Sequence, residues 1–193
     1  MAVSASKIYE GPVYDWKDYH AFIHLFETLA KENNDRICIY YRKGSTYKTL
    51  TWEQVDRIST NLACRWSSSF GHLDAPVAVL ADHSLDYLFY MIALLKLRVV
   101  LQALSPRNTQ AAVANMLIKG KAGYILASEK YADTGKTSAD QVQIPYQTLL
   151  PFDIEALSHE PLNPDAEHIL NKQYITEDEE KIVIITHRYS EWG

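Results

Sequence analysis

The stretch that decides the fold covers residues 76–127 and reads PVAVLADHSLDYLFYMIALLKLRVVLQALSPRNTQAAVANMLIKGKAGYILA. Within it, three short and nearly continuous apolar runs, at residues 76–81, 99–104 and 123–127, are separated by two segments of helical length. Such runs are typical of strands that are buried on both faces of a sheet. Because each connection is long enough for a helix, the alternation predicts an α/β fold in which helices flank a parallel sheet with right-handed connections.

The two connecting segments begin with residues that favour helix starts. Ser84 is expected to cap a helix that continues to Lys96, and Thr109 to cap a helix that ends near Gly120. The hydroxyl of each residue can accept a hydrogen bond from a first-turn backbone amide that has no partner within the helix.

The residues before this stretch predict a helix, a hairpin and a second helix. Apolar side chains recur at three- and four-residue steps after Asp15, which indicates one buried helix face. Residues 36–42 and 45–50, joined by Lys43 and Gly44, have the composition of a hairpin. Thr51 and Gln54 have the spacing of a capping box. The apolar faces comprise Trp16, Tyr19, Phe22, Ile23, Phe26, Leu29 and Ala30 in the first helix, and Trp52, Val55, Ile58, Leu62, Ala63 and Trp66 in the second.

The pattern weakens after residue 127. Residues 133–140 have the composition of an exposed loop, and Pro151, Pro161 and Pro164 are expected to interrupt regular structure. Residues 177–180 are acidic, and the apolar run at residues 182–185 predicts one more buried strand. The predicted core includes Phe22, Phe26, Leu62, Val77, Val79, Leu94, Leu95, Val100 and Ile125.

Composition narrows the class of protein. Lys and Arg number 19 against 24 Asp and Glu, which argues against a nucleic-acid-binding surface because such a surface needs clustered basic residues. No apolar run approaches the ~18 residues of a membrane span, and the first residues lack the apolar core of a signal peptide. A cytoplasmic location is therefore expected. Cys38 and Cys64 lie in apolar segments and are expected to be buried free thiols.

No phosphate-binding loop stands out. Gly120 and Gly123 are near each other, but they precede a strand, whereas a dinucleotide site places its glycines between a strand and a helix. Gly135, Lys136 and Thr137 resemble the end of a P-loop but lack its upstream glycine and its preceding strand. A solvated turn is favoured there.

Metal sites and nucleophiles are equally weakly indicated. His20 and His24 are four residues apart, but no suitable carboxylate follows on the same helix face, so a half-exposed surface is favoured over a metal site. His83, at a strand end, occupies a better functional position, although a surface or capping role is favoured. Ser84 lacks the flanking glycines of a nucleophile elbow.

Two stretches resemble the adenylate-forming, or AMP-binding, ligase superfamily, which includes acyl-CoA ligases and the adenylation domains of peptide synthetases. Residues 47–55, YKTLTWEQV, followed by Asn61-Leu62-Ala63, are similar to an early helix start of the family. A second set follows in the family's order and spacing: PVAVL at 76–80, DY at 86–87, LLK at 94–96, LSPRNT at 104–109, ML at 116–117 and GYIL at 123–126. The variant SPRN at 105–108 is similar to fungal carboxylic-acid-reductase-like and peptide-synthetase-like adenylation domains.

The chain departs from the family pattern at three places. Arg98 stands where the family usually has Gly. The family also usually has a Thr before the strand that begins at Gly123, and near Gly120 this chain has another residue in its place. After residues 182–185 the family has a Ser/Thr/Gly-rich loop that holds the ATP phosphates, whereas this sequence reads THRYSEWG at 186–193. The other catalytic parts of the family follow that loop. We therefore expect no catalytic, cofactor-binding or metal-binding family residue here, an arm at residues 1–13, and an incomplete N-terminal adenylation lobe at residues 14–193.

The resemblance implies a fragment of a ligase that, when complete, would use ATP and Mg²⁺ to activate a carboxylic acid as its acyl-adenylate. The acyl group would then pass to a thiol of CoA or of a carrier protein. The chain alone is expected to bind no cofactor and to be inactive, and open strand edges are expected to favour self-association. Two alternatives are a non-catalytic binding or assembly module and an unrelated doubly wound domain that binds a small ligand at the carboxyl ends of its strands.

Overall fold

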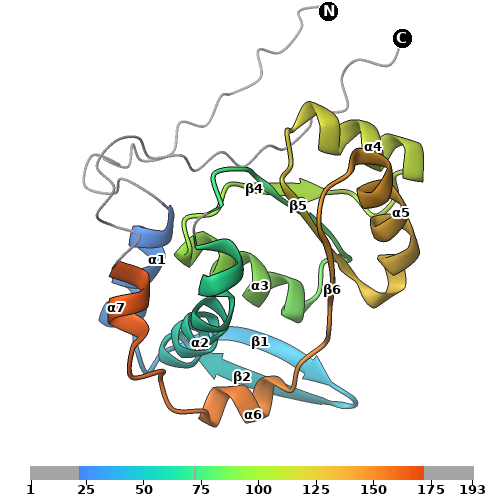
Figure 1. Cartoon of the computed structure of the whole chain (residues 1–193). Coiled ribbons are helices and arrows are strands. Elements are labelled where there is room, and N and C mark those ends of the chain that lie inside the picture. Colours follow the sequence, from blue (N-terminus) through green and yellow to red (C-terminus); the bar gives the residue numbers. More distant parts are fainter. Residues whose placement is uncertain (1–21, 72, 172–193) are drawn as a thin grey trace, which may run out of the picture.

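A computed structural model describes residues 22–71 and 73–171 as helices packed on two β-sheets (Figure 1). In chain order the elements are α1 (Phe22–Glu32), β1 (Ile37–Lys43), β2 (Thr46–Thr51), α2 (Trp52–Phe70), β3 (Val77–Leu80), α3 (Leu85–Lys96), β4 (Leu101–Leu104), α4 (Gln110–Lys119), β5 (Tyr124–Ser128), the 3-10 turn η2 (Glu129–Tyr131), α5 (Ala132–Val142), β6 (Tyr146–Leu149), α6 (Ile154–His159) and α7 (Ala166–Asn171). The three strands and two helices predicted between residues 76 and 127 are all present.

The larger sheet has the strand order β4-β3-β5-β6, and all its neighbouring strands are parallel. Strands β1 and β2 form a separate antiparallel hairpin. The predicted fold class, a parallel sheet flanked by helices, is therefore confirmed. The central strand β3 lies between β4 and β5, so the chain runs to one side of β3 and then returns to the other.

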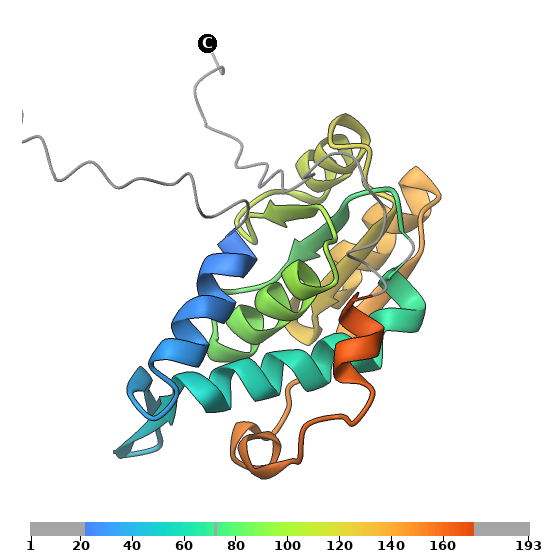
Figure 2. The ribbon, with the colours of Figure 1, turned by 90° about the vertical axis from the view of Figure 1, so that its left-hand side faces the viewer.

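Helices cover both faces of the parallel sheet. Alternate strand residues such as Val77 and Val79 pack with α1, α2 and α3, whereas Ala78 and Leu80 pack with α4 and α5. Figure 2 shows the sheet between these two groups of helices. Strands buried on both faces need mostly apolar side chains, which explains their nearly continuous apolar runs; the buried Gln102 of β4 is an exception.

The residue that departs from the family's usual Gly lies in the turn between α3 and β4. Arg98 has φ 55°, its amide donates to the carbonyl of Leu95 at 3.0 Å, and the amide of Val99 donates to the carbonyl of Leu94 at 3.1 Å. This is a Schellman motif, whose left-handed residue is usually Gly because a Cβ is disfavoured there. A Gly would therefore suit the backbone conformation at position 98 better than Arg does.

The helices α4 and α5 end in turns of the same kind. Lys121, after α4, has φ 52°, and Gln143, after α5, has φ 62°. In these turns, the amide of Ala122 donates to the carbonyl of Leu117 at 3.0 Å, and the amide of Ile144 donates to the carbonyl of Ala139 at 3.1 Å. All three helices between parallel strands thus end in a left-handed residue with a side chain.

The family-like residue Asn61 holds a distant segment against α2. Its Nδ2 donates to the carbonyl of Pro161 at 3.0 Å, and its Oδ1 accepts from the amide of Asn163 at 2.9 Å. Two arginines, four residues before and four residues after Asn61 on α2, contact the same segment: Arg57 donates to the Ser158 carbonyl and Arg65 to the Glu160 carboxylate. The chain between β6 and α7 is therefore held along one face of α2.

Lys96, which belongs to the family-like LLK stretch, is a buried charge. Its ammonium lies 2.8 Å from Asp56 Oδ1, 3.6 Å from Glu27 Oε1 and 5.5 Å from the centre of the Phe26 ring. A buried ammonium needs such partners because its desolvation is otherwise costly. Lys96 thereby joins α3 to both α1 and α2.

The predicted caps are confirmed, but the predicted loop at residues 133–140 is wrong. Those residues belong to α5, in which Gly135, Ser138 and Ala139 are buried. A Cβ at Gly135 would lie 2.7 Å from Ala127 Cβ and 3.0 Å from Tyr146 Cε2. The small residues that read as a loop therefore form the face by which a helix approaches the sheet closely.

Most of the predicted core is confirmed. Seven of the predicted residues are buried, namely Phe26, Leu62, Val77, Val79, Leu94, Leu95 and Ile125. The prediction for Phe22 is wrong, because its side chain is 53% exposed and the buried face of α1 runs through Ile23, Phe26 and Ala30. Val100 is only half-buried. The helices α6 and α7 lie between and after prolines that were expected to prevent regular structure.

Several predictions lie outside the described residues. They are those for residues 1–13, for the first helix before residue 22, for His20 and for the strand at residues 182–185.

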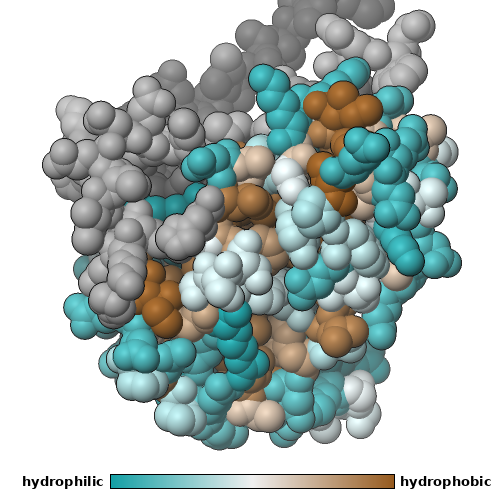
Figure 3. All heavy atoms as spheres, viewed as in Figure 1, coloured by the Kyte–Doolittle hydropathy of each residue, from teal (hydrophilic) through white to brown (hydrophobic). Residues whose placement is uncertain are grey.

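Figure 3 shows several apolar patches, separated by polar side chains, on the face seen in Figure 1. Among the described residues, the most exposed large apolar side chains are Tyr40 and Tyr47 of the hairpin, at 69% and 75%. Self-association through open edges stays a prediction.

Candidate functional site

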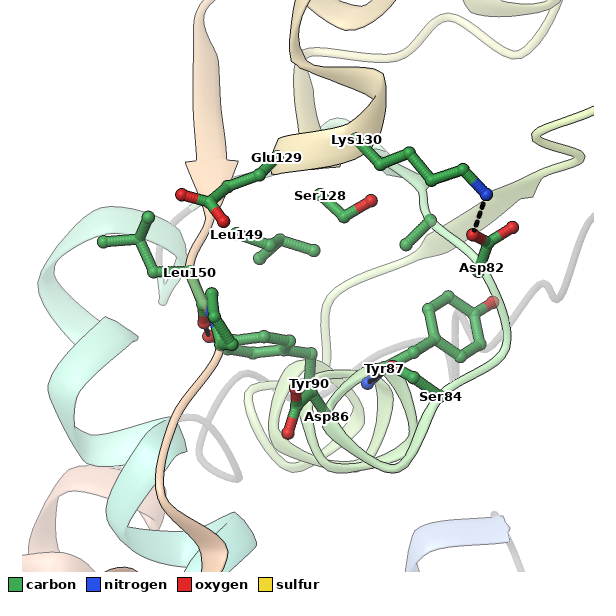
Figure 4. Close-up of a pocket in the computed structure, with 12 residues that line it drawn as sticks. Asp82, Ser84, Asp86, Tyr87, Tyr90, Ser128, Glu129, Lys130, Leu149 and Leu150 are labelled. Carbon is green, nitrogen blue, oxygen red and sulfur yellow. Dashed lines mark hydrogen bonds and ion pairs between the residues drawn. The ribbon is translucent and has the colours of Figure 1, made fainter. Parts of the chain in front are cut away.

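A pocket lies at the carboxyl end of the parallel sheet, where the strand order reverses. In open α/β sheets, ligands bind at this edge because diverging connections leave a crevice there. The pocket has a volume of about 260 Å³. It is lined by Ala81, Asp82, Ser84, Asp86, Tyr87, Tyr90, Ser128, Glu129, Lys130, Leu149, Leu150 and Pro151 (Figure 4). These residues follow β3, lie in or just before the first half of α3, or lie at and after the ends of β5 and β6. We call this the carboxyl-edge pocket.

One rim of the carboxyl-edge pocket is a polar cluster between the ends of β3 and β5. Asp82 accepts hydrogen bonds from Lys130 Nζ and from the Tyr131 hydroxyl, both at 2.7 Å. These hydrogen bonds hold the pKa of Asp82 below its usual range, and the Asp82 carboxylate raises the pKa of Lys130. Because Asp82 and Lys130 are both exposed, the pair chiefly fixes the relative position of the two loops.

Tyr90 forms the inner wall. Its hydroxyl donates to the carbonyl of Leu150, and its ring stacks on Trp66 at 4.8 Å and meets Phe152 edge-on at 5.3 Å. Burial, with a smaller contribution from the charge of Asp86, raises the pKa of Tyr90 to about 12. The phenol is therefore a neutral hydrogen-bond donor that fixes the wall formed by residues 149–151.

The charged side chains that line the carboxyl-edge pocket are mostly acidic. The carboxyl-edge pocket has three carboxylates, Asp82, Asp86 and Glu129, and one ammonium, Lys130. Burial raises the pKa of Asp86, which lies in the first turn of α3. A helix N-terminus favours a carboxylate, so the helix dipole opposes the effect of burial at this position. A second pocket shares Asp86 and Pro151 with the first and extends toward the hairpin.

The residues singled out in the sequence have mostly structural roles. Ser84 accepts a hydrogen bond from the Tyr87 amide at 3.1 Å, which confirms it as a helix cap. The ring of His83 lies 5.4 Å from that of Tyr87, beside the carboxyl-edge pocket. Cys64 is buried and Cys38 half-buried, both are free, and burial raises the pKa of both thiols.

The sequence did not assign the pocket to particular residues, although two signals pointed to it. Asp82 lies two residues after the end of β3 and Glu129 directly after the end of β5, and these strands flank the reversal point. The third wall could not be predicted because β6 was not recognised. Within residues 22–71 and 73–171, no cluster of three metal-ligating side chains is present. Nor is any helix in that part of the chain long and apolar enough to cross a membrane.

Comparison with protein families matches residues 26–187 to the AMP-binding enzyme family. Among solved structures, the luciferase-like enzyme of the nonluminescent mealworm Zophobas morio is 17% identical with a TM-score of 0.62, over 78% of this chain and 37% of that one. The fatty acyl-adenylate ligase of L. pneumophila, solved with acyl adenylate and pyrophosphate, is 14% identical with a TM-score of 0.53, over 73% and 25%. IdnL7 is 17% identical with a TM-score of 0.52, over 68% and 25%.

These likenesses show the fold alone, because the identities are low. The chain spans between a quarter and about two fifths of the length of these structures. A search among curated proteins finds no match. The closer resemblance to fungal reductase-like adenylation domains stays a prediction.

Proposed function

The chain belongs to the AMP-binding enzyme family, and from this premise we propose that it forms the N-terminal part of an adenylate-forming ligase. The complete ligase would activate a carboxylic acid with ATP as an acyl-adenylate and would then pass the acyl group to a thiol of CoA or of a carrier protein. The match of the family model to residues 26–187 carries this proposal. The parallel sheet and its flanking helices support it, because the solved relatives share that fold.

The described residues do not fit ATP and Mg²⁺ by themselves. A polyphosphate in the carboxyl-edge pocket would meet three carboxylates and a single ammonium, which already pairs with Asp82. No cluster of three metal-ligating side chains occurs in the described part of the chain. We therefore assign no step of the reaction to these residues and propose that they serve as scaffold. ATP and Mg²⁺ would be held by further parts of a longer, cytoplasmic protein.

The proposal is tested by ATP–pyrophosphate exchange across a panel of carboxylic acids. The 193-residue chain should show no exchange, because a glycine-rich phosphate loop is missing from its sequence. Oriented donors of that kind are each typically worth ~3–4 kcal/mol of transition-state stabilisation. A longer product of the same gene should show exchange with at least one acid.

Two outcomes would contradict the proposal. Exchange by the 193-residue chain, above background and proportional to its concentration, would show that it carries its own phosphate site. A longer product without exchange and without ATP binding would favour the non-catalytic module instead.

A further inference from the structure

The carboxyl-edge pocket has an unbalanced negative charge. Lys130 is the single cation that lines it, and its ammonium is already 2.7 Å from Asp82. Neither Asp86 nor Glu129 has an ion-pair or hydrogen-bond partner for its carboxylate among the described residues. Figure 4 shows these two carboxylates on opposite walls, Glu129 on η2 and Asp86 on α3. A cleft lined by one sign of charge attracts ligands of the opposite sign.

Carboxylates on an open surface would not specify a ligand, but these border a cavity with an aromatic wall. The rings of Tyr87 and Tyr90 lie on the α3 side of the carboxyl-edge pocket, and Leu149, Leu150 and Pro151 supply apolar surface. Aromatic faces attract cations, and apolar surface accommodates a hydrocarbon body. The position at the reversal of strand order is the one at which α/β sheets bind ligands.

We propose that the carboxyl-edge pocket binds a small organic cation, a primary ammonium carried on a short aromatic or aliphatic body. The ammonium would lie near Asp86 or Glu129, and the body would contact Tyr87, Tyr90 and Leu149. Anionic ligands are disfavoured by the same charges. The volume of about 260 Å³ limits the ligand to a small molecule. None of the proposed contacts involves ATP or a carboxylic acid, so binding can be measured separately from adenylation.

Three probes of nearly equal shape and different charge test this proposal on the 193-residue chain. Phenethylamine is cationic, 2-phenylethanol is neutral and phenylacetate is anionic at neutral pH. In ¹H–¹⁵N correlation spectra, phenethylamine should shift the backbone amide peaks of residues 82–87, 128–130, 149 and 150. The neutral probe should bind about fivefold more weakly, the upper end for a partly solvated ion pair, and the anion more weakly still.

Charge-removing variants locate the site. Asp86→Asn and Glu129→Gln should each weaken phenethylamine binding by about threefold to fivefold, as loss of one partly solvated ion pair implies. Asp140→Asn, an equal charge change at an exposed position near the end of α5, should leave the affinity unchanged. Thermal melts establish that each variant folds, and the two pocket variants lie on different elements, so both need not fail together.

The proposal is overturned if 2-phenylethanol or phenylacetate binds as tightly as phenethylamine. It is equally overturned if both pocket variants retain full affinity, or if Asp140→Asn weakens binding as much as they do. The titration contains no ATP, so its outcome is separate from that of pyrophosphate exchange.

Discussion

Replacing Arg98 by Gly should stabilise the protein. A residue with a Cβ costs roughly 1–2 kcal/mol in the left-handed region, whereas Gly adds ~0.4–1 kcal/mol of conformational entropy to the unfolded chain. Arg98 has φ 55° within an intact Schellman motif, in which Leu94 and Val99 are both buried. The difference between the two terms predicts a net gain of about 1 kcal/mol for Arg98→Gly.

Urea denaturation followed by circular dichroism measures this gain. With a slope of ~2 kcal/mol/M, typical for a chain of this size, the midpoint should rise by about 0.5 M. Arg98→Ala is the matched control, because it removes the side chain but keeps the Cβ. It should not gain stability, and it reports any loss of side-chain contacts. A variant Arg98→Gly that is no more stable than Arg98→Ala would refute the reasoning from backbone conformation.

Three further changes test the core, the corrected helix and the pocket wall. Leu94→Ala should lower the free energy of unfolding by ~2–5 kcal/mol in a thermal or urea melt, because Leu94 is fully buried. The control Leu88→Ala, on the exposed side of the same helix, should change it little. Equal losses for the two variants would show that the helix register is wrong. Gly135→Ala should lower the free energy of unfolding by ~1–3 kcal/mol, because the added Cβ forces α5 away from the sheet. The double variant with Ala127→Gly should recover part of this loss. An unchanged melting point for Gly135→Ala would contradict the close approach of α5 to the sheet. The folded state raises the pKa of Tyr90 from about 10 to about 12, so its stabilisation is complete below pH 10 and is lost as the pH rises through 12. Tyr90→Phe should therefore flatten the decline in stability over that range in alkaline melts, and an unchanged profile would exclude Tyr90 as its cause.

The sequence predicted the parts of the fold whose signals are local. The caps at Thr51, Ser84 and Thr109 were recognisable because a short polar side chain directly precedes an apolar helix face. The strands β3, β4 and β5 were recognisable because burial on both faces demands continuous apolar runs. These features position the first two walls of the carboxyl-edge pocket.

What the sequence did not predict depends on contacts between distant segments. α5 was missed because Gly135 and its small neighbours are explained only by the nearness of Ala127 and Tyr146. The end of α5 carries no Gly at its left-handed residue, Gln143, so the usual stop signal is absent there. The wall at residues 149–151 depends on the Tyr90 hydroxyl, which lies about sixty residues earlier in the chain. No local pattern reports such a contact.

The most direct test of membership in a longer adenylate-forming ligase is the sequence of the transcript beyond codon 193. The account predicts that a loop rich in Gly, Ser and Thr is encoded downstream, in any frame, and that the product is about two to three times as long as this chain, as the coverage of the solved relatives implies. A stop codon immediately after Gly193 in well-supported transcripts, with no such loop downstream, would contradict the account and favour a stand-alone module.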